Sequence, residues 1–311
     1  MTRYKIILNP ASGSGRGAKS EGLVMEQLHQ NDLDFDLTRT KERGHGIHLA
    51  HEASANGFDV IVAAGGDGTV NEVINGLLLA EESGLPARPM GVICVGRGND
   101  FADGVGIPPE VSKACATLAE NEQRRIDIGK VYGGSFPEGR YFGNCVGAGF
   151  DAVTTIEVGK LPRLGGFLSF YLAVMKTIFL SSYDLAVRID YAGKTLRQSC
   201  MLVSVMNGRR LGGGFWMAPE AQPDDGLFDI CIAGSVNRIR IFKLIPHFLR
   251  GDQTTQPEIT TGLAEHILIR ATSGVLPAQT DGEIICVDGK QLEIELIPKR
   301  LSVITRPAGT H

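Results

Sequence analysis

The chain has 311 residues, 43% of them hydrophobic, so it can bury one large core or two ordinary ones, and we expect two domains. Its net charge of −4 provides no broad basic surface, which argues against nucleic acid as a partner. Its 6 cysteines form no CxxC or Cys/His pair, which favours buried thiols in a reducing cytoplasm over disulfides or a zinc site.

The N-terminal part alternates between short apolar runs and helical patterns, the rhythm of a doubly wound α/β sheet. Its first apolar run is too short for a signal peptide. We predict strands at Tyr4–Leu8, Asp34–Thr40, Asp59–Ala64 and Met90–Val95, and helices from about Ala18, over His45–Ala55 and over Thr69–Leu79.

The pattern changes near residue 130. Beyond it we predict strands at Leu185–Tyr191, Gln198–Met206, Leu227–Ile232, Ile267–Ala271 and Leu292–Ile297, with helical spacers at Leu164–Leu180 and Ile239–Leu249. The sequence therefore predicts an α/β domain over residues 1–130 and a β-rich, sandwich-like domain over residues 131–298. The glycine-rich stretch Gly133–Gly139 is expected to be a hairpin tip near the boundary.

The most apolar stretch, Leu164–Leu180, is interrupted by Lys176 and is shorter than a membrane span requires. We expect no transmembrane segment in this chain. A helix packed on a sheet is the favoured interpretation of this stretch, and a greasy lid or an interfacial patch near a lipid is the alternative.

A glycine turn follows the third predicted strand and reads Gly65-Gly66-Asp67-Gly68-Thr69. A strand that ends in such a turn and opens a helix presents backbone N–H groups to a phosphate. Asp67 would meet phosphates only through a shared cation or proton, so the turn predicts nucleotide phosphate plus metal. Thr69 is expected to be the helix N-cap, with Glu72 completing a capping box.

Two further glycine turns follow predicted strands, one from Asn9 to Ser20 and one from Gly96 to Ala102. The first approaches the P-loop pattern, but Ala18 replaces its second glycine, and it lacks the acid that a dinucleotide site requires. In isolation it fits a surface loop equally well. Because parallel strands end at one edge of a sheet, we expect all three turns to line the same phosphate site.

Motifs along essentially the whole chain resemble those of the bacterial diacylglycerol kinase family, relatives of sphingosine and ceramide kinases. The resemblance rests on the three glycine turns and on Asn144-x-x-Gly147-x-Gly149-Phe150-Asp151-Ala152, Gly212-Gly213-Gly214, Pro223–Asp229 and Asp281-Gly282-Glu283. It implies an ATP- and Mg²⁺-dependent lipid kinase whose active site lies in the interdomain cleft. It also implies that residues 299–311 return to the first domain.

The resemblance carries residue roles onto matching positions. It assigns nucleotide binding to Asn9, Ser12, Gly13, Thr40, Gly65, Gly66, Asp67, Gly68, Thr69 and Asn71. Asp67 would also act in catalysis, where it holds the cation near the phosphates. Asp281 and Glu283 resemble the pair that removes the proton of the lipid hydroxyl; family usage favours Glu283, while the spacing alone leaves the choice open.

The chain departs from the family pattern around the third turn, where Cys94 stands in place of the common proline, and in the second domain. Arg97 replaces the usual threonine of the third turn, where it would contact a phosphate directly or form a loop salt bridge. The family's structural magnesium ligands correspond to Gln222, Asp225 and the Leu227 carbonyl, with Asp224 as a substitute. Gln222 is uncharged, so the affinity for Mg²⁺ should fall unless Asp224 compensates.

Two other functional classes remain open: an NAD or sugar kinase with the same glycine turn, and a non-catalytic nucleotide- or lipid-binding regulator. We expect a cytoplasmic enzyme that associates peripherally with the membrane to reach its lipid, whose identity the sequence does not specify. Sheets with exposed edges often pair, so a homodimer is a further expectation.

Overall fold

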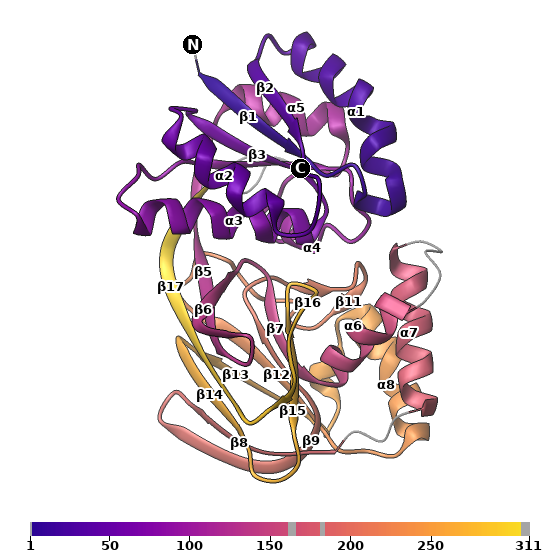
Figure 1. The fold of residues 1–311 in the computed structure, drawn as a ribbon. Helices are drawn as coiled ribbons and strands as arrows, with labels where there is room; N and C mark the ends of the chain where they lie inside the picture. The colour runs from indigo at the N-terminus through magenta and orange to yellow at the C-terminus, as the bar shows by residue number, and fades with distance from the viewer. Residues whose placement is uncertain (1, 161–165, 181–183, 306–311) are drawn as a thin grey trace. The chain divides into compact units, whose positions relative to one another are not determined.

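The computed structural model describes residues 2–160, 166–180 and 184–305 (Figure 1). The chain divides into two compact units, with breaks after Ile126 and after Pro298. The first unit contains residues 2–126 and the returning segment from Lys299, and the second unit contains Asp127–Pro298. Among the described helices, none combines the length and hydropathy needed to cross a membrane.

The first unit is built on a parallel sheet in the order β2-β1-β3-β4. Its strands are β1 (Arg3–Leu8), β2 (Asp34–Arg39), β3 (Val60–Gly65) and β4 (Met90–Cys94). The end of β17 (Gln291–Ile304) joins it, since Val303 pairs with Met90 in parallel register. Strand β3 is buried along its whole length, as its unbroken apolar run predicts.

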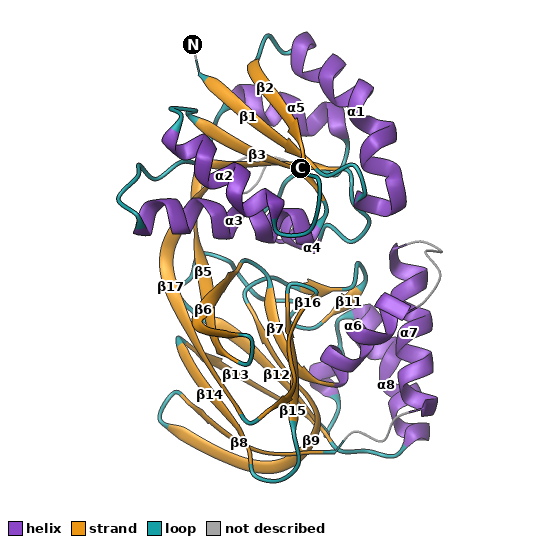
Figure 2. Ribbon diagram, viewed as in Figure 1, coloured by secondary structure: helices purple, strands orange, loops and turns teal. Residues whose placement is uncertain are grey.

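Helices cover both faces of this sheet (Figure 2). They are α1 (Ser12–Gln30), α2 (His45–Ala55), α3 (Asp67–Glu82), α4 (Asp100–Gly104) and α5 (Val111–Glu120). Val24 and Leu28 of α1 and Leu118 of α5 share one core with Ile6 and Val62 of the sheet. The predicted doubly wound α/β arrangement is therefore confirmed, although α4 and α5 were not among the predicted helices.

The second unit is a β-rich body with one helical layer (Figures 1 and 2). Its strands are most of β5 (Gln123–Gly133), β6 (Phe136–Phe142), β7 (Cys145–Gly149), β8 (Leu185–Tyr191), β9 (Lys194–Met206), β10 (Arg210–Leu211), β11 (Phe215–Trp216), β12 (Phe228–Gly234), β13 (Ile259–Ala264), β14 (His266–Ala271), β15 (Leu276–Thr280), β16 (Glu283–Gly289) and most of β17. Its helices are α6 (Phe150–Lys160), α7 (Gly166–Leu180), α8 (Arg238–Arg250) and the short η1 (Gln253–Thr255).

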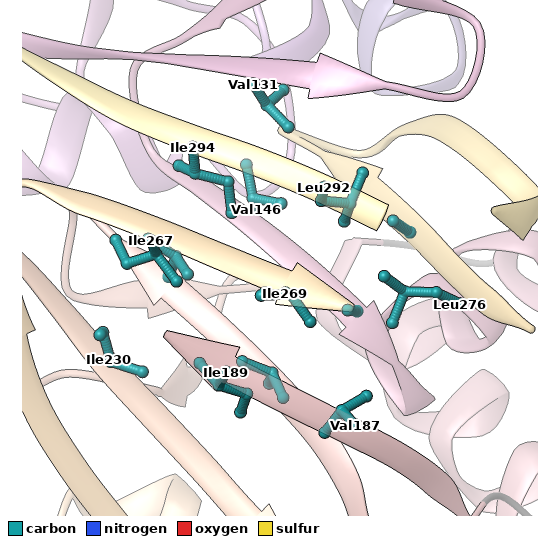
Figure 3. Close-up of a cluster of buried hydrophobic side chains, with 14 of the residues drawn as sticks. Val131, Val146, Val187, Ile189, Ile230, Ile267, Ile269, Leu276, Leu292 and Ile294 are labelled. Atoms are coloured by element: carbon teal, nitrogen blue, oxygen red, sulfur yellow. The ribbon is translucent and has the colours of Figure 1, made fainter. Parts of the chain in front are cut away.

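The long strand β9 belongs to both layers of strands in this unit. Its first part pairs with β8, and its last part lies between β7 and β12. Apolar side chains from both layers, such as Ile189, Ile230 and Ile294, pack into one core (Figure 3). The sandwich-like expectation for the C-terminal half is thus confirmed.

A second core lies on the other side of β7, β9 and β12, where α7 and α8 cover the strands. Met201 and Leu202 of β9 pack there with Val174 of α7 and Leu244 of α8. The predicted spacers Leu164–Leu180 and Ile239–Leu249 are these two helices, and residues 164 and 165 lie outside the described residues. Helix α6 was not predicted, because the glycines before it resemble a turn.

Gly76 of α3 sets the distance between α2 and α3, and this allows a test of the packing. A Cβ at position 76 would lie 2.4 Å from the Ile47 carbonyl oxygen and 2.7 Å from the Ala50 Cβ. We expect Gly76→Ala to lower the free energy of unfolding by about 1–3 kcal/mol, measured by urea denaturation. Gly22 is an exposed position of α1 where a Cβ would meet nothing within 4 Å. Gly22→Ala should therefore raise the free energy of unfolding by up to about 1 kcal/mol. Equal midpoints for the two variants would contradict the close packing of α2 on α3.

Candidate functional site

The first unit brings three loops together at the carboxyl ends of β1, β3 and β4. Strand β1 lies between β2 and β3, so the chain changes direction across the sheet beside β1. Such a switch point is where open α/β sheets bind ligands. Asn9 bridges the first two loops, because its Nδ2 donates to Thr69 Oγ1 at 3.0 Å and its backbone N–H to the Ala64 carbonyl at 2.9 Å.

Glycines allow the loops after β3 and β4 to touch through their backbones. A Cβ at Gly96 would lie 2.3 Å from the Gly66 Cα, and one at Gly65 would lie 2.2 Å from Thr69 Oγ1. No other residue fits such spacings without moving the chain. The prediction that the glycine turns open at the same edge of the sheet is confirmed.

The loop after β1 contains three successive residues with left-handed backbones. Gly13, Ser14 and Gly15 have φ of 59°, 59° and 88°, and regular helical conformation follows them, close to the predicted start near Ala18. Ser14 is not a glycine, so its conformation stores strain of the kind that gathers at binding loops. Arg16 ties this loop to the third one, because its Nη1 donates to the Gly96 carbonyl at 3.2 Å.

Asp67 opens α3 and faces the third loop. Its Oδ1 accepts a hydrogen bond from the Phe101 N–H at 3.1 Å. Burial raises the pKa of this carboxyl, and hydrogen bonds from the backbone N–H groups of Phe101, Asn99 and Asp100 oppose that shift. A carboxylate that has lost part of its hydration is well suited to a cation, which would replace the lost solvation.

The predicted capping box is wrong. The N-cap of α3 is Gly66, which makes no side-chain cap hydrogen bond, and Thr69 lies within the first turn. The Glu72 carboxylate instead accepts from the backbone N–H groups of Gly44 at 2.7 Å and Gly46 at 2.9 Å. The N-cap of α2 is the left-handed Gly44, which has no side chain to cap with, so Glu72 caps α2 from the neighbouring helix.

The other residues expected to bind nucleotide have different surroundings. Ser12 is half-buried, and its backbone N–H donates to the Asn9 carbonyl. Thr40 is buried, and its backbone N–H donates to the Leu8 carbonyl. Asn71 is 3% exposed on α3 and accepts from the Asn75 amide. Gly68 is exposed at the start of the same helix.

Two polar side chains of the third loop lack partners. The half-buried Arg97 guanidinium forms no hydrogen bond or ion pair with any residue that the structure describes. Asn99 has a left-handed φ of 54°, and its buried Oδ1 has no hydrogen-bond partner in the described chain. Asn99 belongs to the Gly96–Ala102 motif, but the sequence alone assigns it no binding role. Its unpartnered oxygen marks it as a candidate binding residue, and only the structure shows this.

The two distal acids diverge at a turn, one of the two geometries that their spacing permitted. Asp281 and Gly282 both have positive φ, 45° and 82°. The Asp281 carboxylate accepts from the consecutive N–H groups of residues 143, 144 and 145 at 2.9, 3.1 and 2.8 Å. Glu283 instead pairs with Arg140 Nη2 at 2.8 Å, and its side chain is 24% exposed.

The predicted magnesium ligands of the second unit form a weak donor set. Asp225 is exposed and its Oδ1 accepts from the Leu227 N–H at 3.0 Å, which is a local turn bond; Gln222 is also exposed and Asp224 half-buried. Burial, with the charges of Asp225 and Glu220, raises the pKa of Asp229 to about 6. Within the described residues, no group of 3 or more acidic, histidine or cysteine side chains is arranged to hold a metal ion.

A further buried acid, Asp151, lies at the start of α6. It is 5% exposed and accepts a hydrogen bond from the Ser204 hydroxyl on β9. Burial raises its pKa to about 6 against that hydrogen bond, and its charge in turn helps burial raise the pKa of the Cys231 thiol to about 12. The sequence showed Asp151 only as part of a motif, without a role.

Comparisons with known proteins agree over nearly the whole chain. The family model of the diacylglycerol kinase catalytic domain matches residues 3–131, and that of the YegS C-terminal NAD kinase beta sandwich-like domain matches residues 144–305. A diacylglycerol kinase of Bacillus subtilis (strain 168) is 35% identical over 286 residues, which are 91% of this chain and 90% of that protein.

Solved structures share the fold. A diacylglycerol kinase from Bacillus anthracis str. Sterne has a TM-score of 0.72 at 24% identity, covering 99% of this chain and 98% of its own. An NAD kinase from Archaeoglobus fulgidus, solved in complex with ATP, has a TM-score of 0.54 at 15% identity, covering 98% and 94%. Both likenesses concern the fold alone, and the more distant one does not favour an NAD kinase.

The Asp281 contacts predict a stabilising role for this carboxylate. Replacing it in Asp281→Asn removes the charge that the three backbone N–H groups solvate, so we expect a loss of about 1–3 kcal/mol in unfolding free energy. Asp288→Asn on exposed β16 is the matched control and should change stability by less than about 0.5 kcal/mol. Urea unfolding of both variants checks this, and a control-like result for Asp281→Asn would show that the anchor is not needed.

The raised pKa of Asp151 predicts a pH-dependent stability. Between the ordinary value of 3.8 and about 6, the folded carboxyl stays protonated while the unfolded one ionises. The wild type should therefore lose up to about 3 kcal/mol relative to Asp151→Asn as pH rises through this window, and keep its full relative stability below it. Urea unfolding of both proteins near pH 4 and near pH 7 measures the difference. A difference that stays constant with pH would mean that Asp151 is not strongly desolvated.

Proposed function

Because this chain belongs to the diacylglycerol kinase family, we propose that it is an ATP-dependent lipid kinase that phosphorylates the hydroxyl of a lipid such as diacylglycerol. The observation that carries the proposal is the meeting of three glycine loops around Asp67 at the switch point of the first sheet. Phosphoryl transfer depends mainly on positioning the reactants and neutralising the charge of the phosphates. The loops at this edge of the sheet would contribute to both through their backbone N–H donors.

The first unit would bind the triphosphate. Backbone N–H groups of the loops around Gly13, Gly66 and Gly96 would face the phosphates, as they do where a glycine turn opens a helix. Arg97 would add a cation, because it has no partner among the described residues. The unpartnered Asn99 Oδ1 would accept a hydrogen bond from the nucleotide or from a water molecule bound with it.

Mg²⁺ would be held through Asp67. The donor set fits in one respect: a desolvated carboxylate stands among the phosphate-binding loops. When bound, the ion would neutralise charge on the transferring phosphate. In the second unit the set of Gln222, Asp224, Asp225 and Leu227 has fewer charges than hard cations prefer, so we propose at most weak binding there.

Glu283 would take the proton of the lipid hydroxyl. Its side chain is 24% exposed and forms an ion pair with Arg140, so the carboxylate is within reach of an incoming hydroxyl and has a cation beside it. Asp281 would act as a positioning residue, because three backbone N–H groups occupy its carboxylate. It fixes the turn on which Glu283 stands.

We propose that the enzyme meets its lipid at a membrane surface through α7 and α8. On α7, Leu168, Leu172 and Phe179 are 52%, 37% and 61% exposed, and on α8 Ile239 is 71% exposed. A helix with apolar side chains on its solvent-facing side as well as on its buried side needs a second apolar surface against that exposed side. Exposed Arg238 and Lys243 on α8 would complement anionic head groups beside that cover.

A phosphotransfer assay tests the proposed function. The protein is supplied with radiolabelled ATP and Mg²⁺ and offered diacylglycerol, phosphatidylglycerol and a sphingoid base in mixed micelles, with NAD and a hexose phosphate as soluble acceptors. We expect label in one lipid, and a loss of about 10²–10⁴-fold in rate for Glu283→Gln with ATP binding unchanged. Asp288→Asn should keep the wild-type rate.

Each other outcome of this assay has a definite meaning. Label in NAD or the sugar phosphate would replace the lipid proposal, while ATP binding without transfer to any acceptor would favour a regulator. A wild-type rate for Glu283→Gln would remove its role as base. Arg97→Thr should raise the KM for ATP and leave the KM for lipid unchanged, and an unchanged KM for ATP would contradict the phosphate contact.

A further inference from the structure

A half-buried arginine of the second unit lies beside the acid proposed as the base. Arg140 is on β6, and its side chain is only 11% exposed, although arginine is among the residue types that are mostly exposed. Its Nη2 donates to Glu283 Oε2 at 2.8 Å, and 143 positions of sequence separate the two residues. Because a charge that loses its water needs a partner, this ion pair helps to compensate for the burial of Arg140.

The hairpin of β5 and β6 holds the guanidinium of Arg140 in place. The centroid of the Phe136 ring lies 5.4 Å from Arg140 Cζ, which is a cation–π distance, and Phe136 itself packs on the core of the unit. The tip of the hairpin is tied to β16, because the Ser135 N–H donates to the Ile285 carbonyl at 3.0 Å. Gly134 permits this contact, since a Cβ there would lie 2.6 Å from the same carbonyl oxygen. The hairpin is therefore fixed against the strand that carries the partner of its arginine.

The turn that precedes Glu283 is fixed by side chains on both sides of it. The Asp281 carboxylate accepts its three backbone hydrogen bonds from the end of β6 and the start of β7. Gln279 is fully buried, and its Oε1 accepts from the Gly282 N–H at 2.8 Å. The backbone at Glu283 is thus well defined, but its side chain has three rotatable bonds. A contact at the end of that side chain, such as the Arg140 ion pair, selects one of its rotamers.

We propose that Arg140 is a positioning residue of the phosphoryl transfer and that it acts through Glu283. This inference rests on the proposed function and states how the base of that reaction is oriented. In the reaction the hydroxyl oxygen bonds to the γ-phosphorus, the bond from that phosphorus to the bridging oxygen breaks, and ADP leaves with the electron pair. The hydroxyl proton goes to the Glu283 carboxylate, which the guanidinium keeps in one place and whose negative charge it offsets.

The same hairpin provides a matched control residue on its other face. Val131 pairs with Arg140 and Lys130 pairs with Tyr141, so the side chain of Lys130 lies on the opposite face from that of Arg140, because successive side chains of a strand alternate. Lys130 Nζ donates to the Tyr141 hydroxyl at 3.3 Å and lies 4.5 Å from the centroid of that ring. Its cation therefore lies over an aromatic ring, as the Arg140 cation does, but on the face away from the proposed base.

A double-mutant cycle on the full chain tests the proposal. Arg140→Met, Glu283→Gln and the double variant are assayed with ATP and Mg²⁺ on whichever acceptor the wild type labels. We expect Arg140→Met to lower kcat about 10–100-fold and to leave the KM for ATP unchanged. In the Glu283→Gln background the same change should alter kcat by less than about twofold, because the group through which Arg140 acts is already absent. Lys130→Met should keep the wild-type kcat.

Chemical rescue separates orientation of the base from a merely structural role. Arg140→Ala leaves room for a free guanidinium ion, and about 50 mM guanidinium chloride is far below the concentrations that unfold a domain. We expect this salt to raise the kcat of Arg140→Ala at least about fivefold, and to have no such effect when Glu283→Gln is also present. Sodium chloride at the same concentration controls for ionic strength, and thermal melting checks that each variant is folded.

The outcomes separate failure of this inference from failure of the proposed function. If the wild type labels a lipid but Arg140→Met keeps its kcat, or loses the same factor with and without Glu283, the role of Arg140 is overturned and the lipid kinase stands. The same holds if sodium chloride rescues Arg140→Ala as well as the guanidinium salt does, or if neither rescues it. If the wild type labels NAD or a hexose phosphate and the cycle is non-additive, the lipid function is overturned and the role of Arg140 stands. A wild type that labels no acceptor would overturn both.

Discussion

The close approach of backbones at the carboxyl ends of β1, β3 and β4 is the constraint on which the first unit depends. Gly66 and Gly96 come so near that a Cβ on the latter would lie 2.3 Å from the Cα of the former. Glycine turns of this kind let backbone N–H groups approach a polyanion closely, which is the basis of the proposed phosphate site. Packing of the loops and the proposed affinity for phosphate would therefore have the same cause, so a substitution that disrupts the packing is expected to weaken phosphate binding as well.

Three aspartates show how surroundings, rather than residue type, decide what a carboxylate can do. Asp281 accepts three backbone hydrogen bonds and serves as an anchor. Asp67 has donors from one loop and lost hydration, which suits it to a cation. Asp151 is buried, which makes its ionisation costly, and the hydrogen bond from the Ser204 hydroxyl offsets only part of that cost.

The sequence predicted those features that depend on local pattern. Alternation of apolar runs and helical periods predicted the two kinds of domain, and the position of glycines after strands predicted where the loops meet. The capping box failed because Thr69 and Glu72 have the right spacing but Glu72 caps α2, a contact between residues 26 and 28 positions apart. The anchoring of Asp281 by residues more than 130 positions away is likewise invisible to spacing. Both carboxylates, of Glu72 and Asp281, accept from residues that are distant in the sequence, so local spacing and propensity could not predict their roles.

Helix α7 shows why the composition of one segment admitted two interpretations. A core helix and an interfacial helix both require apolar residues, and sequence alone cannot say how many sides of the helix the protein covers. The structure buries Ala173 and Thr177 against the unit and leaves Leu172 and Phe179 outside. The packing of α7 on the sheet is therefore confirmed for its inner side, whereas the exposed apolar side chains are the observation on which the proposed contact with a lipid surface rests.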